Sequence, residues 1–95
     1  MSFNGGEFKT YTKSKVLSDI YDASIECMDY LPDHLRIVMK ERYINQKKID
    51  QIAKDNNIST SSVKNWIRKG TSELKYEVMY RYPDLCDLYN DIEKD

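Results

Sequence analysis

The residues whose types and spacing point to one chemistry lie between positions 59 and 69 of the 95-residue chain. Four consecutive hydroxyl residues precede a cluster of amide and basic side chains; the set is Ser59, Thr60, Ser61, Ser62, Lys64, Asn65, Arg68 and Lys69. An asparagine amide can pair in bidentate fashion with the major-groove edge of adenine. Lysine and arginine suit phosphate contacts, which carry no sequence information. This pattern of residues therefore predicts that the segment contacts DNA.

Apolar residues at helical spacing occupy the other face of the same segment. This stripe consists of Val63, Trp66, Ile67, Gly70, Leu74 and Val78. The period predicts a helix, which Pro83 ends. If the stripe faces the core, the residues that face outward are Thr60, Ser61, Lys64, Asn65 and Arg68. Gly70 either permits close helix packing or breaks the segment in two.

A shorter helix is predicted before this one, over residues 48–55. Ile49, Ile52 and Ala53 form its inner face, and Asn57 suits the following turn because asparagine tolerates left-handed backbone. A small contact residue, a tolerant turn residue and apolar anchors on the second helix define a helix-turn-helix, which we predict at residues 49–68. Basic side chains in and beside the unit are candidate phosphate contacts: Lys47, Lys48, Lys54, Arg68 and Lys69.

Helical periods also cover most of the remaining chain. A stripe that includes Val16, Leu17, Ile20, Tyr21 and Cys27 predicts a helix from Ser14 to about Tyr30, and Pro32 suits the first turn of the next helix. We predict an all-α fold, a small helical bundle of four to five helices. Its parts are a flexible N-terminal arm over residues 1–13, a helical domain over 14–82 and an acidic amphipathic segment over 83–95.

The charges of this chain are distributed unevenly, although the net charge is only −1. Residues 1–35 carry three basic and six acidic side chains, residues 36–75 carry ten basic and four acidic, and residues 76–95 carry two basic and six acidic. A basic centre therefore lies between two acidic flanks. Charge asymmetry of this kind indicates an anionic partner such as double-stranded DNA.

Other classes of function find no support in the sequence. A single histidine, scattered carboxylates and the lack of a glycine-rich phosphate loop offer no catalytic site, no cofactor site and no metal site. Cys27 and Cys86 have no metal-binding spacing, and without a secretory signal we expect reduced thiols in a cytoplasmic protein. No apolar run exceeds three residues, so we expect no membrane segment.

Five short residue pairs and a closing Leu74 are spaced along the centre of the chain; the pairs are Leu31-Pro32, Arg42-Tyr43, Ile52-Ala53, Ile58-Ser59 and Val63-Lys64. Over about residues 31–75 they resemble region 4 of the sigma-70 family of RNA polymerase sigma factors. The resemblance implies that Thr60, Ser61, Lys64 and Asn65 contact the −35 promoter element, and that the body docks on the β-flap of RNA polymerase. Hydroxyl residues 60–62 stand where typical members carry Arg or Glu.

The length of the chain leaves no room for region 2, which opens the −10 element in the same family. We therefore expect a stand-alone regulator of the phage or mobile-element type, or one half of a split sigma factor. Two alternatives stay open. The chain is a module that binds RNA polymerase or a sigma or anti-sigma partner with little DNA contact, or a DNA-binding accessory of recombination or packaging. A homodimer is compatible with DNA binding, since one helix-turn-helix rarely suffices.

Two further features have more than one interpretation. The acidic segment is expected to pack Leu85, Leu88 and Ile92 onto the first helix, but it could instead dock on a partner or cover the basic centre. Trp66 is expected in the core. The later tyrosines either form a partner surface or cover the core of the domain itself; they are Tyr76, Tyr80, Tyr82 and Tyr89.

Overall fold

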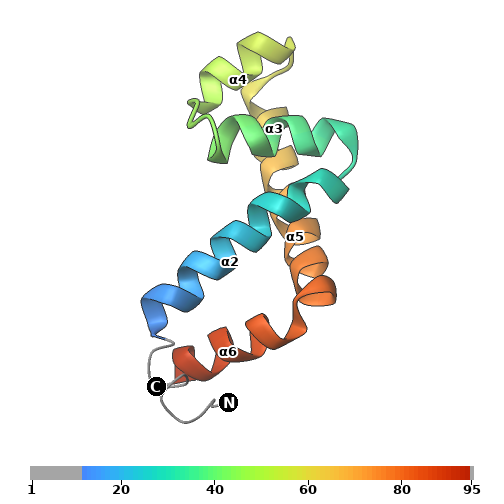
Figure 1. Ribbon diagram of the computed structural model, residues 1–95. Coiled ribbons are helices and arrows are strands. Elements are labelled where there is room, and N and C mark those ends of the chain that lie inside the picture. Colours follow the sequence, from blue (N-terminus) through green and yellow to red (C-terminus); the bar gives the residue numbers. More distant parts are fainter. Residues whose placement is uncertain (1–11, 95) are drawn as a thin grey trace, which may run out of the picture.

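Helices occupy nearly all of the chain described by the computed structural model, which covers residues 12–94 and the side chains of residues 12–91. Their order is α2 (Lys13–Cys27), the 3-10 turn η1 (Met28–Tyr30), α3 (Asp33–Tyr43), α4 (Ile49–Asn56), α5 (Thr60–Arg81) and α6 (Pro83–Lys94), as Figure 1 shows. No strand occurs in this described range. The predicted all-α class is confirmed, with five α-helices.

The 22-residue helix α5 is the element on which the others pack. Helices α3 and α4 lie across its N-terminal half, whereas α2 and α6 lie beside its C-terminal half (Figure 1). Helix α6 follows α5 after one residue and turns back to contact α2. The two halves of α5 therefore serve different sets of neighbours.

Local sequence explains where α4 ends and α5 begins. Asn57 has a φ of 56°, the left-handed conformation that asparagine tolerates better than most residues. The Ile58 N–H donates to the Ala53 carbonyl at 3.0 Å and completes the helix end. The Ser59 hydroxyl accepts from the Ser62 N–H at 3.0 Å, an N-cap that satisfies one of the free donors of α5. The predicted turn at Asn57 is confirmed, and the first residue of the hydroxyl run supplies the cap.

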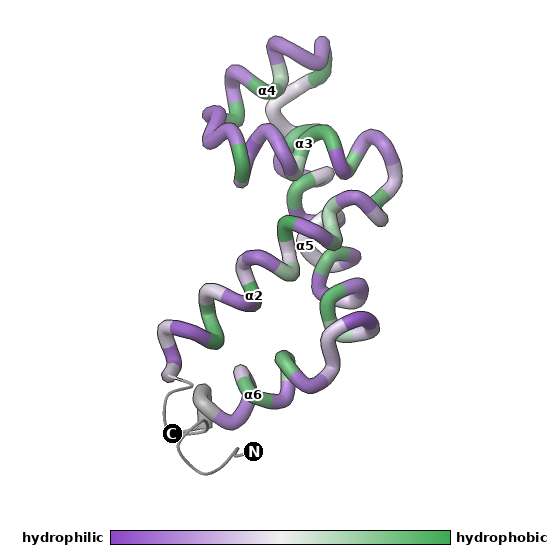
Figure 2. Tube along the Cα trace, in the orientation of Figure 1, coloured by the Kyte–Doolittle hydropathy of each residue, from purple (hydrophilic) through white to green (hydrophobic). Residues whose placement is uncertain are grey.

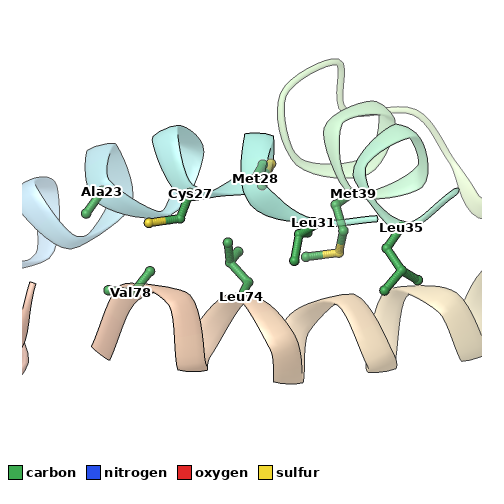
Figure 3. Packing of buried hydrophobic residues seen from close by; sticks show 8 residues of the cluster. All are labelled: Ala23, Cys27, Met28, Leu31, Leu35, Met39, Leu74 and Val78. Atoms are coloured by element: carbon green, nitrogen blue, oxygen red, sulfur yellow. The ribbon is translucent and has the colours of Figure 1, made fainter. Parts of the chain in front are cut away.

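Two clusters of buried residues form the core. The larger one joins α2, η1, α3 and α5 through Ala23, Cys27, Met28, Leu31, Leu35, Met39, Leu74 and Val78 (Figure 3). The smaller one joins α3, α4 and α5 through Val38, Ile52, Ala53 and Val63. Trp66 and Ile67 pack against both clusters. These two side chains of α5 connect the helix-turn-helix to the rest of the domain.

Gly70 permits close packing and does not interrupt α5, which runs unbroken from Thr60 to Arg81. A Cβ at this position would lie 2.7 Å from Met39 Cγ and 2.9 Å from Met39 Sδ, closer than real Cβ atoms approach. Of the two sequence-based alternatives, the first is therefore confirmed. The glycine lets α3 approach α5 with a fully buried methionine between them.

Several sequence-based expectations need correction. The first helix begins at Lys13, inside the predicted arm, and its last turn is the 3-10 turn η1. Residues 1–11 of that arm lie outside the described residues. Leu17 and Tyr21 are 42% and 56% exposed and not part of the buried stripe. Both residues belong to α2, which contacts α5 near Cys27 and also contacts α6. Neither neighbour covers the side chains of Leu17 and Tyr21 completely.

The acidic segment forms α6 and packs against α2, as expected. Leu85 is partly buried beside the larger cluster, whereas the side chain of Ile92 lies outside the described residues. Tyr82, the residue between α5 and α6, is bonded to α2, because its hydroxyl donates to the Glu26 carboxylate at 2.5 Å. The Arg81 guanidinium lies 3.5 Å from the centre of the Tyr30 ring. Polar and apolar residues are interspersed along α2 and α6, as expected for amphipathic helices (Figure 2).

The packing at Gly70 predicts that Gly70→Ala destabilises the protein although alanine favours helix. Crowding a filled core costs about 1–3 kcal/mol, and the gain in helix propensity recovers about 1 kcal/mol. We expect a net loss of about 1 kcal/mol in the free energy of unfolding, measured with urea. Ser72→Ala, at an exposed position of the same helix, is the control and should be neutral or stabilising. An equal gain for both variants would contradict the close contact with Met39.

Candidate nucleic-acid interface

The first three turns of α5 present all four candidate base contacts to solvent. Thr60, Ser61, Lys64 and Asn65 are exposed, whereas Val63 between them is fully buried. Because successive residues turn by about 100° along a helix, Ser61, Lys64, Asn65 and Arg68 share one face. Val63, Trp66 and Ile67 occupy the opposite one. The orientation predicted from the apolar stripe is therefore the one that the fold adopts.

The rotation of α5 is fixed by residues on its inner face. Val63 packs with Val38 and Ile52, and Trp66 lies between the two core clusters. The His34 and Trp66 rings have centres 5.0 Å apart and an interplanar angle of 77°, the T-shaped arrangement that ring pairs favour. The Trp66 indole packs against the core, as expected, but it is only partly buried.

Asn65 is not an isolated side chain on the outer face. The Arg68 guanidinium donates a hydrogen bond to the Asn65 side-chain oxygen. An amide oxygen has a second lone pair and the amide nitrogen has two donors, so the asparagine keeps capacity for a base edge. The sequence offered one signal for this contact, because residues three apart are neighbours on a helix surface.

Lys47, a candidate phosphate contact, is held inside a polar network between α3 and α4. Its ammonium lies 3.0 Å from the Asp55 carboxylate and 3.7 Å from the Glu41 carboxylate. The Gln51 amide donates to Asp55 at 2.7 Å, and Arg42 donates to the Lys47 carbonyl at 3.0 Å. The positive charge of Lys47 is therefore largely balanced by its own domain.

The same contacts shift the protonation of both partners. Hydrogen bonds from Lys47 and then Gln51 hold the pKa of the Asp55 carboxyl below its ordinary value. The hydrogen bond to Asp55 raises the pKa of the Lys47 ammonium. Both directions favour the charged pair and strengthen the connection between α4 and the end of α3.

The other candidate phosphate contacts remain accessible. Lys48, Lys54, Arg68 and Lys69 are exposed. Among the side chains of residues 12–91, the recorded ion pairs of the basic centre involve Arg36, Lys40 and Lys47. Lys48 and Lys54 belong to the α4 side of the unit, and Arg68 and Lys69 belong to α5. Since α4 and α5 are in contact, the fold brings these four cations onto adjacent helices.

The acidic residues of α6 lie away from this interface. Helix α6 contacts α2 and α5, and it leaves the outward residues of the first turns of α5 exposed. Asp84, Asp87 and Asp91 are themselves exposed. The interpretation in which the acidic segment covers the basic centre is therefore wrong for this arrangement of helices.

A metal site and a membrane span are absent from the described residues. Within them, no group of three or more His, Cys, Asp or Glu side chains could hold a metal ion. Both cysteines are free, and burial raises the pKa of the Cys27 and Cys86 thiols. None of the helices so described combines the length and the apolar character that a membrane crossing requires.

Comparison with known protein families identifies one match. The family model described as "Sigma-70, region 4" matches residues 22–74, more than half of the chain. The matched part begins within α2, includes all of α3 and α4, and ends at Leu74 in α5. No curated protein matches the chain. No solved structure matches it either.

The pKa of Asp55 predicts a loss of stability in acid. A carboxyl whose pKa is depressed in the folded state stabilises the fold above its unfolded pKa and loses that contribution as the pH falls. We expect the wild-type free energy of unfolding to fall between about pH 5 and pH 3, and the fall to be smaller in Asp55→Asn. Asp22→Asn, at an exposed position of α2, is the control and should follow the wild type. Parallel pH profiles for Asp55→Asn and wild type would contradict the role of this pair.

Proposed function

Since the chain belongs to the sigma-70 region 4 family, we propose that it is a transcription regulator that binds promoter DNA through α5. Domains of this family are non-enzymatic modules that typically bind promoter DNA through a helix-turn-helix. The observation that carries the proposal is the exposed polar face of α5, opposite the buried Val63. A helix held in this way can enter the major groove without disturbing the core.

The proposed roles follow from side-chain chemistry and placement. Asn65 contacts an adenine edge in the major groove, and Lys64 contacts a base edge or the adjacent phosphate. Thr60 and Ser61 are short donors and acceptors at the start of the helix, where close approach to bases causes no clash. The accessible cations contact phosphates; these are Lys48, Lys54, Arg68 and Lys69. Lys47 instead stabilises the α3–α4 connection through Asp55.

A net charge of −1 is compatible with this proposal because the charges are segregated. The acidic residues of α6 lie beside α2 and the C-terminal half of α5. The exposed lysines of α4 and of the early turns of α5 lie at the other end. The N-terminus of α5 adds a partial positive charge near the phosphates. Local potential, more than net charge, determines how an anionic partner binds.

The finer parts of the proposal concern partners and context. We propose a stand-alone regulator of the phage or mobile-element type that acts in the cytoplasm and docks on the β-flap of RNA polymerase. A helix-turn-helix monomer gains specificity from a second copy or from polymerase. Polymerase and a homodimer are therefore the two partners to test, by binding selections on random DNA with and without polymerase.

A second candidate function is a protein-interaction module with little DNA contact. The observation that favours it is the exposed aromatic surface on α5, where Tyr76 is 69% and Tyr80 is 82% exposed. Tyrosine is enriched in protein–protein interfaces. Of the four later tyrosines, Tyr82 and Tyr89 are partly buried, whereas Tyr76 and Tyr80 are exposed and available to a partner. An accessory role in recombination or packaging would appear as DNA binding without promoter-proximal footprints.

Salt dependence distinguishes DNA binding from the module that binds only protein. About four to six phosphate contacts should give a log–log slope of affinity against salt concentration near −4 to −5. Gel shifts or fluorescence anisotropy of the full chain measure this slope. Lys69→Ala should make it shallower by about one on every DNA sequence. A flat salt response would favour the interaction module.

Base contact by Asn65 is tested with one variant on two kinds of DNA. Asn65→Ala should weaken binding to the selected site by about 1–3 kcal/mol and relax preference at one base pair. It should leave binding to unrelated DNA unchanged. Ser72→Ala, about two turns further along the same face of α5, is the matched control. Equal losses on both DNAs would reject a base-specific role for Asn65.

A further inference from the structure

An open apolar groove is lined by residues of α2, the C-terminal half of α5 and α6. Figure 1 shows these helices on the side of the molecule away from α4. Its volume is about 610 Å³, within the range of pockets that hold small organic ligands. Leu74 and Val78 form its buried floor, and Leu17 and Met79 stand at its rim with 42% and 46% of their surfaces exposed. These apolar walls come from three separate helices and leave space between them.

Of the described residues that line the groove, one is charged, Lys75. It is exposed, and among the described side chains no ion pair or hydrogen bond is recorded for its ammonium. The other polar lining residues are neutral: Ser24, Thr71, Tyr89 and Asn90. The pairing that would neutralise Lys75 is therefore open to a ligand.

Among the side chains of residues 12–91, no carboxylate of the neighbouring helices lines the groove. Asp84, Asp87 and Asp91 are exposed on α6, whereas α6 lines the groove with Cys86, Tyr89 and Asn90. On α5, Glu77 is paired with Arg81 at 3.0 Å. Among the described lining side chains, an occupant with a cationic group would meet Lys75 and no carboxylate. Charge complementarity selects an anionic occupant with an apolar body.

We propose that this groove binds a small amphipathic carboxylate of the fatty-acid type. The apolar tail lies between Leu17, Val78 and Met79, and the carboxylate pairs with Lys75. A pocket of mainly apolar lining with a few convergent polar groups has the usual composition of a ligand site. This site is separate from the DNA-binding face, so neither proposal depends on the other.

The test uses the full 95-residue chain with octanoate, decanoate and decanol, followed by titration calorimetry and by NMR shifts of the Met79 methyl group. Binding of decanoate should be saturable. Each buried methylene is expected to strengthen binding about fourfold, so decanoate should bind about 15-fold more tightly than octanoate. An exposed lysine–carboxylate pair predicts a preference of about two- to fivefold for decanoate over decanol.

Two variants test the placement of head group and tail. Lys75→Gln should abolish the preference for decanoate over decanol, whereas Lys69→Gln, an exposed lysine of the same helix outside the groove, should retain it. Thr71→Phe places a ring on the groove wall at an exposed position and should abolish saturable binding. Circular dichroism of all three variants, and DNA binding of Lys75→Gln and Thr71→Phe, report an intact fold.

Three results would overturn the proposal. The first is non-saturable binding by the wild type, and the second is equal binding of octanoate and decanoate. The third is a preference for decanoate over decanol that persists in Lys75→Gln. Failure of the wild type to bind DNA would reject the proposed function, but it would not contradict the proposed carboxylate site.

Discussion

The rotation of α5 about its axis is the constraint on which the rest of the structure depends. Val63 is fully buried against Val38 and Ile52, and Trp66 connects both core clusters. Truncating a large core side chain of this kind costs about 3–5 kcal/mol, so rotation of the helix by a third of a turn would be strongly disfavoured. The inner face thereby fixes which polar residues of the same helix meet solvent.

Electrostatics divides the molecule along the same helix. Near α4 and the start of α5, exposed lysines remain available to phosphates, whereas Lys47, Lys40 and Arg36 are engaged by carboxylates of their own domain. At the far end, the acidic α6 packs on α2 and lines an apolar groove together with α2 and α5. A nearly neutral chain can thus combine an anion-binding end with an acidic end, because charged surfaces separated by more than about 10 Å are largely screened from each other in salt.

Features set by neighbouring residues could be predicted from the sequence, and features set by distant contacts could not. The outward placement of Asn65, the left-handed turn at Asn57 and the cap at Ser59 all depend on local spacing. The pairing of Lys47 with Glu41 and Asp55 depends on how α3 meets α4. Likewise, the exposure of Leu17 and Tyr21 depends on the angle at which α6 returns to α2, which no local pattern encodes.

The most direct test of the account is amide chemical-shift mapping of the full chain against a duplex selected from a random library. The account predicts the largest shifts at Thr60, Ser61, Lys64 and Asn65, with smaller ones around Lys48 and Lys54 and little change in α6. Shifts concentrated in α2 and α6, with the first turns of α5 unchanged, would contradict it.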